Sequence, residues 1–300
     1  MDSTNAATHV RKRSFVRFGV VIAFIAAYVA VVFGYTVSIQ NAGVYHNPAA
    51  PHGGVALGFV PTTADPALAT LTGVLYVIPS DELVDEGGRL SKELTVDVLP
   101  TIGAGSTTFK VGQTIATMNV VLDIQGDVRN YPFDTYSTAI ITSASVRDSA
   151  NAPWETIPVA AGASGELTGW KMSLTSPDSV DIDGDTFKTS DDYGIEEVHL
   201  ERAESTVVIA MVVILLMTLL AMFAVLVSRA FALGKKKFEP GLTGWMAAML
   251  FALIPLRNFL PGAPPLGSWI DILVVFWVQI VIMASLAWYV GRWLRMRPTD

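Results

Sequence analysis

Long apolar stretches without charged residues lie near both ends of the chain, and a segment with short alternating patterns separates them. Charge-free apolar runs cover residues 18–37, 206–228 and 272–291, and a shorter charge-free window covers residues 240–256. A helix needs about 20 mostly apolar residues to span a bilayer, within a range of about 17 to 25. The sequence therefore predicts four transmembrane helices, at residues 18–38, 206–228, 241–260 and 269–291.

The composition agrees with a membrane protein. The chain is 51% hydrophobic and 16% charged, whereas soluble domains carry about 25% charged residues. It has no cysteine, which excludes disulfides, thiol catalysis and cysteine-based zinc or iron–sulfur sites. The net charge of −7 argues against a nucleic-acid partner. No metal and no cofactor are expected.

Basic residues mark one side of the predicted helices. Eleven of the 20 basic residues flank them on the same side: Arg11, Lys12, Arg13, Arg17, Arg229, Lys235, Lys236, Lys237, Arg292, Arg295 and Arg297. Basic residues favour the cytoplasmic side. We therefore expect a multi-pass protein of the plasma (inner) membrane, with cytoplasmic segments at residues 1–17, 229–240 and 292–300. The first helix is expected to be an uncleaved signal anchor, and a cleaved secretory signal is the alternative.

The segment between the first two helices, residues 39–205, is predicted to be an extracytoplasmic domain facing the periplasm or outside. It holds eight basic and 23 acidic residues. Its net negative charge would repel anionic headgroups and nucleic acid. Runs rich in Val, Ile, Thr and aromatics predict strands at residues 71–78, 94–99, 114–124, 136–146, 170–175 and 195–200. Within the third run, alternation predicts that Ala116, Met118, Val120, Leu122 and Ile124 face a core. Short strands with frequent turn signals indicate an all-β fold, a β-sandwich or jelly roll.

Motifs for catalysis or metal binding are not found in this sequence. The run from Asp181 to Asp185 fits a β-hairpin turn at Asp183-Gly184 better than a calcium loop, whose glycine and glutamate positions it does not match. The four histidines have no helical metal-ligand spacing, and no acidic partner is expected for them. Phosphate-loop, dinucleotide and serine-hydrolase signatures are also absent. We expect no catalytic residues and no enzymatic activity.

A turn between two strong predicted strands contains Tyr131, Pro132, Phe133 and Asp134. Its aromatic–proline bond is a candidate for the cis form. Phe133 would either plug the end of the β domain or contact the helices or a partner. The tetrapeptide resembles the Pro-Phe-Asp turn of pentameric ligand-gated channels, which in that family meets the membrane domain. Those channels place all four helices after the β domain, whereas here one helix precedes it.

The outer hairpin between the last two helices, residues 261–268, is rich in Pro and Gly. Arg257 and Asp271 flank it and are predicted to form an ion pair, because charges at a bilayer edge usually pair. The hairpin is either an architectural clasp or a docking surface for another membrane protein or a lipid headgroup. Small residues on the third helix, where helices can pack closely, form a candidate partner-binding seam: Gly241, Gly244, Ala247 and Ala248.

The order of one helix, a β domain and three helices, with the Tyr-Pro-Phe-Asp turn and the Arg-Asn…Pro-Gly-x-Pro-Pro-x-Gly hairpin, resembles a family of membrane proteins found mainly in actinobacteria. Within this family the chain is similar to coordinator subunits of mycobacterial MCE (mammalian cell entry) lipid transporters. The resemblance implies a non-catalytic accessory subunit of a lipid or fatty acid importer, with other transporter subunits as partners and lipid as a further candidate partner. The alternative is a self-assembling, ligand-responsive channel or sensor.

Overall fold

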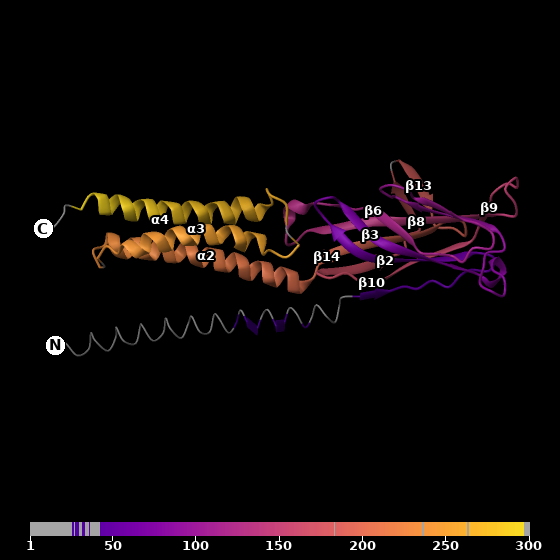
Figure 1. The fold of residues 1–300 in the computed structure, drawn as a ribbon, viewed down its shortest axis with the longest axis horizontal. Coiled ribbons are helices and arrows are strands. Elements are labelled where there is room, and N and C mark those ends of the chain that lie inside the picture. Colours follow the sequence, from indigo (N-terminus) through magenta and orange to yellow (C-terminus); the bar gives the residue numbers. More distant parts are fainter. Residues whose placement is uncertain are drawn as a thin grey trace. The chain divides into compact units, whose positions relative to one another are not determined.

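The computed structural model describes residues 43–182, 184–235, 237–262 and 264–296, together with residues 26, 28, 29, 32, 33 and 36. The predicted first transmembrane helix, residues 18–38, therefore lies largely outside the described residues. The chain divides into two compact units (Figure 1). The β unit comprises Asn41–Ala203 and Pro264–Trp269, and the helical unit includes Glu204–Ala263 and Ile270–Asp300.

Two large sheets build the β unit. The five-stranded sheet has the order β1 (Gly43–Tyr45), β10 (Val159–Glu166), β2 (Val55–Asp65), β3 (Thr70–Pro79) and β6 (Met118–Asp123). The second sheet has the order β11 (Trp170–Thr175), β14 (Gly194–Arg202), β8 (Thr135–Arg147), β4 (Glu93–Leu99) and β5 (Ser106–Phe109). Two short strands, β7 (Gln125–Gly126) and β9 (Glu155–Ile157), also pair with β8. All these pairs are antiparallel except β10 with β2.

One hydrophobic core lies between the two sheets. It combines Phe59 and Leu75 of the first sheet with Val96, Ile140 and Leu200 of the second, all nearly or fully buried. Alternation along the strands accounts for this arrangement, because successive side chains point to opposite faces of a sheet. A separate hairpin of β12 (Ser179–Ile182) and β13 (Asp185–Lys188) closes where the sequence predicts a turn, and Gly184 has a positive φ of 94° there.

The six strands expected from the sequence are all present, and one boundary is wrong. Strand β6 begins at Met118, so residues 114–117 of the third predicted strand are not in a strand. Met118, Val120, Leu122 and Ile124 are buried as predicted, but Ala116 is exposed. Ala116 fits the alternating pattern of the sequence. The strand begins only at Met118, however, so the pattern does not place Ala116 in the core. The described residues of the β unit contain just two short helical turns, η1 (Asp81–Leu83) and η2 (Val128–Asn130).

The C-terminal part of the helical unit contains three described helices: α2 (Glu204–Ala232), α3 (Pro240–Asn258) and α4 (Phe276–Leu294), the last preceded by a π-helical turn, η3 (Asp271–Val275). Each of the three is long and apolar enough to cross a membrane. Pro240 opens α3, where its missing N–H costs nothing, and Pro255 lies inside the last turn. These helices indicate that the protein is associated with a membrane.

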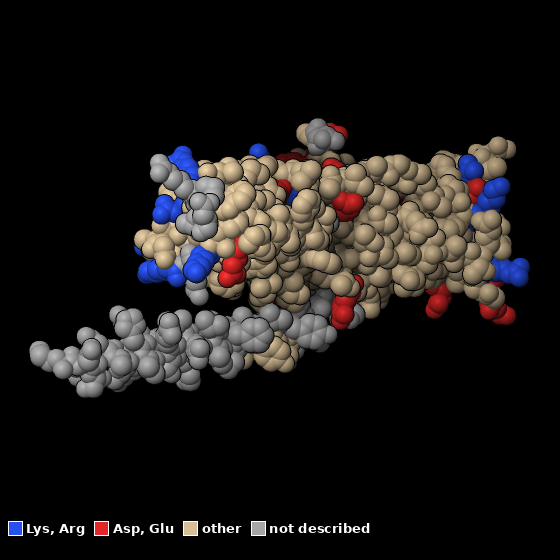
Figure 2. All heavy atoms as spheres, turned by 60° about the vertical axis from the view of Figure 1, so that its left-hand side comes forward, with Lys and Arg blue, Asp and Glu red and all other residues tan. Residues whose placement is uncertain are grey.

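Aromatic packing joins α2 and α4 to the α2–α3 loop. Tyr289 is fully buried, and its ring centroid lies 4.6 Å from that of Phe231 and 5.2 Å from that of Phe238. The Tyr289 hydroxyl donates to the Glu239 carbonyl at 3.2 Å and accepts from the Glu239 N–H at 3.0 Å. About one turn before the end of α2, Ser228 Oγ donates to the Ser285 carbonyl of α4 at 2.8 Å. Lys and Arg side chains gather at one end of this unit (Figure 2).

Candidate functional site

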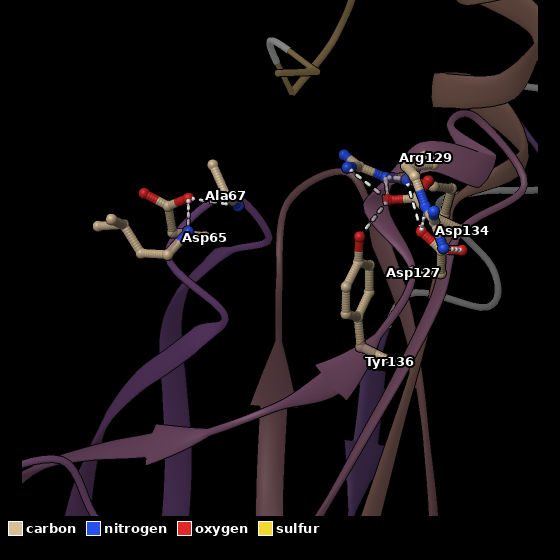
Figure 3. A network of polar contacts seen from close by, with 8 residues as sticks. Asp65, Ala67, Asp127, Arg129, Asp134 and Tyr136 are labelled. Carbon is tan, nitrogen blue, oxygen red and sulfur yellow. Dashed lines mark hydrogen bonds and ion pairs between the residues drawn. The ribbon is translucent and has the colours of Figure 1, made fainter. Parts of the chain in front are cut away.

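The turn that contains Tyr131, Pro132, Phe133 and Asp134 connects η2 to β8. Asp127 caps η2, since its Oδ1 accepts the Arg129 N–H at 3.0 Å, and the Arg129 guanidinium binds both carboxylate oxygens at 2.9 Å (Figure 3). This pairing lowers the pKa of Asp127. The Tyr131–Pro132 peptide bond is cis. The exposed ion pair and the capped turn together fix the start of the loop.

Asp134 forms a buried ion pair with Arg202, the last residue of β14. Arg202 Nε donates to Asp134 Oδ1 at 3.0 Å, and Arg202 Nη2 donates to Oδ2 at 2.9 Å. The Arg202 side chain is 3% exposed and that of Asp134 is 0% exposed. The Tyr136 hydroxyl also donates to Asp134 Oδ2, at 2.9 Å (Figure 3). Such a bidentate, fully satisfied geometry is what a buried charge pair requires.

Aromatic rings surround the Arg202 guanidinium. Its central carbon lies 4.0 Å from the ring centroid of Trp170, its cross-strand partner on β11, and 5.1 Å from that of Tyr131. Cation–π attraction is strongest in desolvated sites such as this one. Burial, followed by the Asp134 charge, raises the pKa of Tyr136 well above its ordinary value of 10.0. Tyr136 therefore remains a protonated donor to Asp134.

The turn buries one aromatic ring and exposes the other. Tyr131 is completely buried, whereas Phe133 is 60% exposed. Tyr131 is the residue that plugs this end of the β unit. Phe133 projects from the turn, and its apolar ring is available for contact with another molecule.

A polar hollow of about 540 Å³ lies beside the turn. Asp127, Asn130, Tyr136, His199 and Glu201 are among its lining residues. Gly126 is needed at its wall, because a Cβ there would lie 2.3 Å from the Tyr136 ring. Carboxylate, amide, imidazole and hydroxyl groups could hydrogen-bond a small polar solute in this hollow.

The structure brings Arg257 and Asp271 together in the helical unit. Arg257 Nε donates to Asp271 Oδ1 at 3.1 Å, and Nη2 donates to Oδ2 at 3.0 Å. The side chains are 13% and 7% exposed. The pair joins the last turn of α3 to the first residue of η3, and so closes the base of the connection that contains residues 261–268.

The small residues of α3 form a seam on the outside of the helix. Gly241, Gly244 and Ala248 are exposed, and Ala247 is half-buried. A Cβ added at either glycine would meet no described heavy atom within 4 Å, apart from the helix's own backbone. The described chain therefore leaves this seam open.

The expectation that no histidine has an acidic partner is wrong. His46 Nδ1 lies 3.1 Å from Glu196 Oε1, His52 Nε2 lies 2.8 Å from Glu82 Oε1, and His199 Nε2 lies 3.5 Å from Glu197 Oε2. Folding brings His46 to Glu196 and His52 to Glu82 from distant positions in the sequence. His199 and Glu197 are two residues apart on β14 and therefore share one face of the strand. Among the described residues, no group of three or more His, Cys, Asp or Glu side chains is arranged to hold a metal ion.

Glu196 is the least expected of these acids, because its side chain is only 4% exposed and lies within β14. Oε1 accepts a hydrogen bond from Ser176 Oγ at 2.9 Å, whereas the buried Oε2 has no hydrogen-bond partner. Burial raises the pKa of Glu196, and Ser176 and His46 oppose that shift.

Sequence reasoning missed the roles of Arg202 and Glu196, although the sequence contained a signal for both. Residues 196, 198, 200 and 202 share one face of β14, and Val198 and Leu200 identify that face as the core. A charged residue in phase with core positions has to find a partner. The signal indicates that Arg202 is paired but does not identify Asp134.

The two parts of the chain match different family models. Residues 45–191 match a domain of unknown function, DUF4436, and residues 202–296 match another domain of unknown function, DUF8686. The first match lies within the β unit, and the second begins at the last residue of β14 and covers the three described helices. Comparison with curated proteins finds no match.

Proposed function

We propose that the chain is a non-catalytic accessory subunit of a transport complex in the plasma (inner) membrane. The helix expected at residues 18–38 and helices α2, α3 and α4 would cross the membrane, with both termini in the cytoplasm. The β unit would be an extracytoplasmic β-sandwich. The resemblance of the sequence points to an MCE-type lipid or fatty acid importer, and to its lipid-uptake coordinator subunit in particular.

The observation that carries the proposal is that polar side chains of the helices form hydrogen bonds or ion pairs within the helical unit. The hydroxyls of Thr218, Ser228 and Thr243 each donate to a backbone carbonyl of the helical unit. Arg257 and Asp271 neutralise each other. A solute path needs polar groups facing a cavity, whereas here these groups are used within the chain. The outward faces of the helices are left for lipid and for other helices.

Two surfaces support binding to a partner. The open seam of Gly241, Gly244, Ala247 and Ala248 suits close packing against a transmembrane helix, which in lipid depends on van der Waals contact at small residues. Phe133 offers an exposed apolar ring on a turn that the Asp134–Arg202 pair holds rigidly. Exposed aromatic residues are common anchors in protein interfaces.

An affinity pull-down tests this function. The tagged full-length chain, extracted in mild detergent, should co-purify with membrane transporter subunits that mass spectrometry identifies. The matched control is Gly244→Ala/Ala248→Ser, which keeps the seam small and should retain the same subunits. Recovery of the chain alone, or only as a ring of identical copies, would contradict the proposal.

One observation favours the second candidate, a self-assembling ligand-responsive channel or sensor. The Asp134–Arg202 pair ties the turn to the end of β14, and α2 begins only two residues later, at Glu204. A ligand in the polar hollow beside the turn could shift β14 and so the start of α2. The size of the particle in mild detergent separates the candidates, since a closed ring of one chain is expected only for the channel.

A further inference from the structure

An apolar groove of about 360 Å³ runs between α2 and α4. Its lining includes Val225 and Ala232 of α2 and Val281 and Ala284 of α4. The hydrogen bond from Ser228 Oγ to the Ser285 carbonyl joins the two helices at the groove. Both serines are buried, so the accessible wall is almost entirely hydrocarbon. Such a wall suits an alkyl chain.

The groove has a basic end. Arg229 lines it, and so does Trp288, which is 65% exposed. Trp288 also lines a neighbouring hollow of about 590 Å³, which Arg292 and Arg295 line as well. The three arginines are exposed, and no acidic side chain in the described part of the chain forms an ion pair with any of them.

The order of these residues along α4 matches the order of groups in a phospholipid. Val281 and Ala284 come first, Trp288 follows one turn later, and Arg292 lies one further turn on. With a rise of 1.5 Å per residue, Val281 and Arg292 are about 16 Å apart along the helix axis. The hydrocarbon of a lipid would contact Val281 and Ala284. The boundary between hydrocarbon and headgroups would lie at Trp288, because tryptophan is favoured at that depth. The phosphate would then reach Arg292.

We propose that the α2–α4 groove binds one anionic phospholipid of the cytoplasmic leaflet. One acyl chain would lie along Val225, Val281 and Ala284, and the phosphate would lie between Arg229 and Arg292. Guanidinium groups bind phosphate through paired, charge-assisted hydrogen bonds. The inference rests on the membrane insertion in the proposed function but not on any transporter partner.

The charge of the site distinguishes this occupant from a partner helix. An apolar helix in the groove would cover Val225 and Ala284 but would give Arg229 and Arg292 no counter-charge. An anionic lipid satisfies the apolar wall and both arginines at once. A zwitterionic lipid fits the same wall but carries an ammonium group that the arginines repel.

Native mass spectrometry of the purified full-length chain tests the site. The probes are synthetic phosphatidylglycerol and phosphatidylcholine with identical acyl chains, added at equal concentrations in detergent. One phosphatidylglycerol should be retained in preference to phosphatidylcholine. Arg229→Gln/Arg292→Gln should reduce that retention by about tenfold, which corresponds to about 1.4 kcal/mol. Ala284→Phe, which fills the groove, should reduce retention of both lipids.

Matched controls make the result specific. Lys235→Gln/Lys237→Gln removes the same charge from the same end of the unit, and Leu215→Phe adds an aromatic ring at an exposed position of α2 outside the groove lining. Both controls should retain phosphatidylglycerol like the unaltered chain, and excess inorganic phosphate should not displace it. Equal retention of the two lipids, or equal losses in the arginine and lysine variants, would overturn the proposal. Because this assay needs no other subunit, its outcome is independent of the pull-down.

Discussion

Arg202 and Asp134 form a bidentate ion pair across 68 residues of sequence, and both side chains are almost fully removed from water. One partner ends β14, and the other ends the turn that exposes Phe133. The pair therefore fixes the position of this turn against the strand that leads into α2. Trp170, Tyr131 and Tyr136 complete its surroundings, so neither charge depends on solvent.

Removing one member of this pair should destabilise the β unit strongly. Arg202→Ala or Asp134→Ala leaves a buried charge without its partner, which typically costs about 3–5 kcal/mol. The double variant should be less destabilised than the sum of the two single variants. Chemical denaturation of the full-length chain, followed by tryptophan fluorescence, measures the free energy of unfolding.

The exposed pair of Arg129 and Asp127 provides the control, because its side chains are 78% and 40% exposed. Arg129→Ala should cost little stability, because exposed ion pairs are screened by solvent and contribute weakly. If Arg202→Ala is no more harmful than Arg129→Ala, the buried pair does not have the structural role assigned to it.

The strands could be predicted from the sequence where alternation is strong. The run from Met118 to Ile124 predicts its core face correctly because every second residue is large and apolar. Strand β10 was missed because its sequence, VAAGASGE, consists mostly of Ala and Gly. Its strand conformation depends on pairing with β1 and β2, which are distant in sequence.

The candidate site could be predicted only in part, for a similar reason. The Tyr-Pro-Phe-Asp turn can be recognised as a sequence motif. Arg257 and Asp271 can be predicted to pair because they flank the short connection between two consecutive helices. The partner of Asp134 depends instead on which strands pair. Because β14 lies between β8 and β11, it places Arg202 beside both Asp134 and Trp170.

The Arg257–Asp271 pair should brace the connection between α3 and α4. Arg257→Ala is expected to lower the thermal stability or abundance of the protein more than Arg257→Ala/Asp271→Ala does. The single change leaves the largely buried Asp271 carboxylate unpaired, whereas the double change removes both charges. Simple additivity of the two single effects would show that the two side chains are not energetically coupled.

Glu196 should make the stability of the β unit depend on pH. Burial raises the folded-state pKa of Glu196 above its ordinary value of 4.5. The stabilising contribution of the protonated carboxyl is therefore fully present below pH 4.5 and is lost as the pH rises through the folded-state pKa. Relative to the unaltered chain, Glu196→Gln should gain stability as the pH rises from acidic values to neutrality.

Thermal unfolding midpoints of Glu196→Gln and of the unaltered chain, measured from acidic pH to neutrality, give the difference in stability. The titrations of other groups affect both proteins and largely cancel in this difference. His46→Ala should increase the effect, because His46 opposes the rise in the Glu196 pKa. Glu201→Gln controls for removing one carboxylate from the same strand. A difference between Glu196→Gln and the unaltered chain that does not vary with pH would contradict the prediction.

The β unit and the C-terminus should lie on opposite sides of the membrane. The prediction rests on the basic residues that flank the helices on one side. Reporters fused after Asp300 and inserted in the turn at Gly184 should give opposite signals. The β12–β13 hairpin closes at that turn, and such a turn can accept an insertion. Matching signals would overturn the proposed topology.

Finally, the chain should act through association with other proteins and not as a pore. Gly244→Leu/Ala248→Leu fills the open seam of α3 and should detach the protein from its complex, because bulky side chains prevent close helix packing. Nothing in the described chain lies against a Cβ at Gly244, so the fold should remain intact. Circular dichroism of the variant and its loss of partners in the pull-down provide the two measurements.

The unaltered full-length chain, reconstituted alone in liposomes, should conduct no ions, because the hydroxyls of Thr218, Ser228 and Thr243 donate to backbone carbonyls within the helical unit. Flux is measured with a potential-sensitive dye at neutral and acidic pH. An ion flux that Phe133→Ala abolishes would show that the turn couples to a conducting state, since the exposed Phe133 ring is not needed for the core of the β unit. That result would replace the accessory subunit with the ligand-responsive channel.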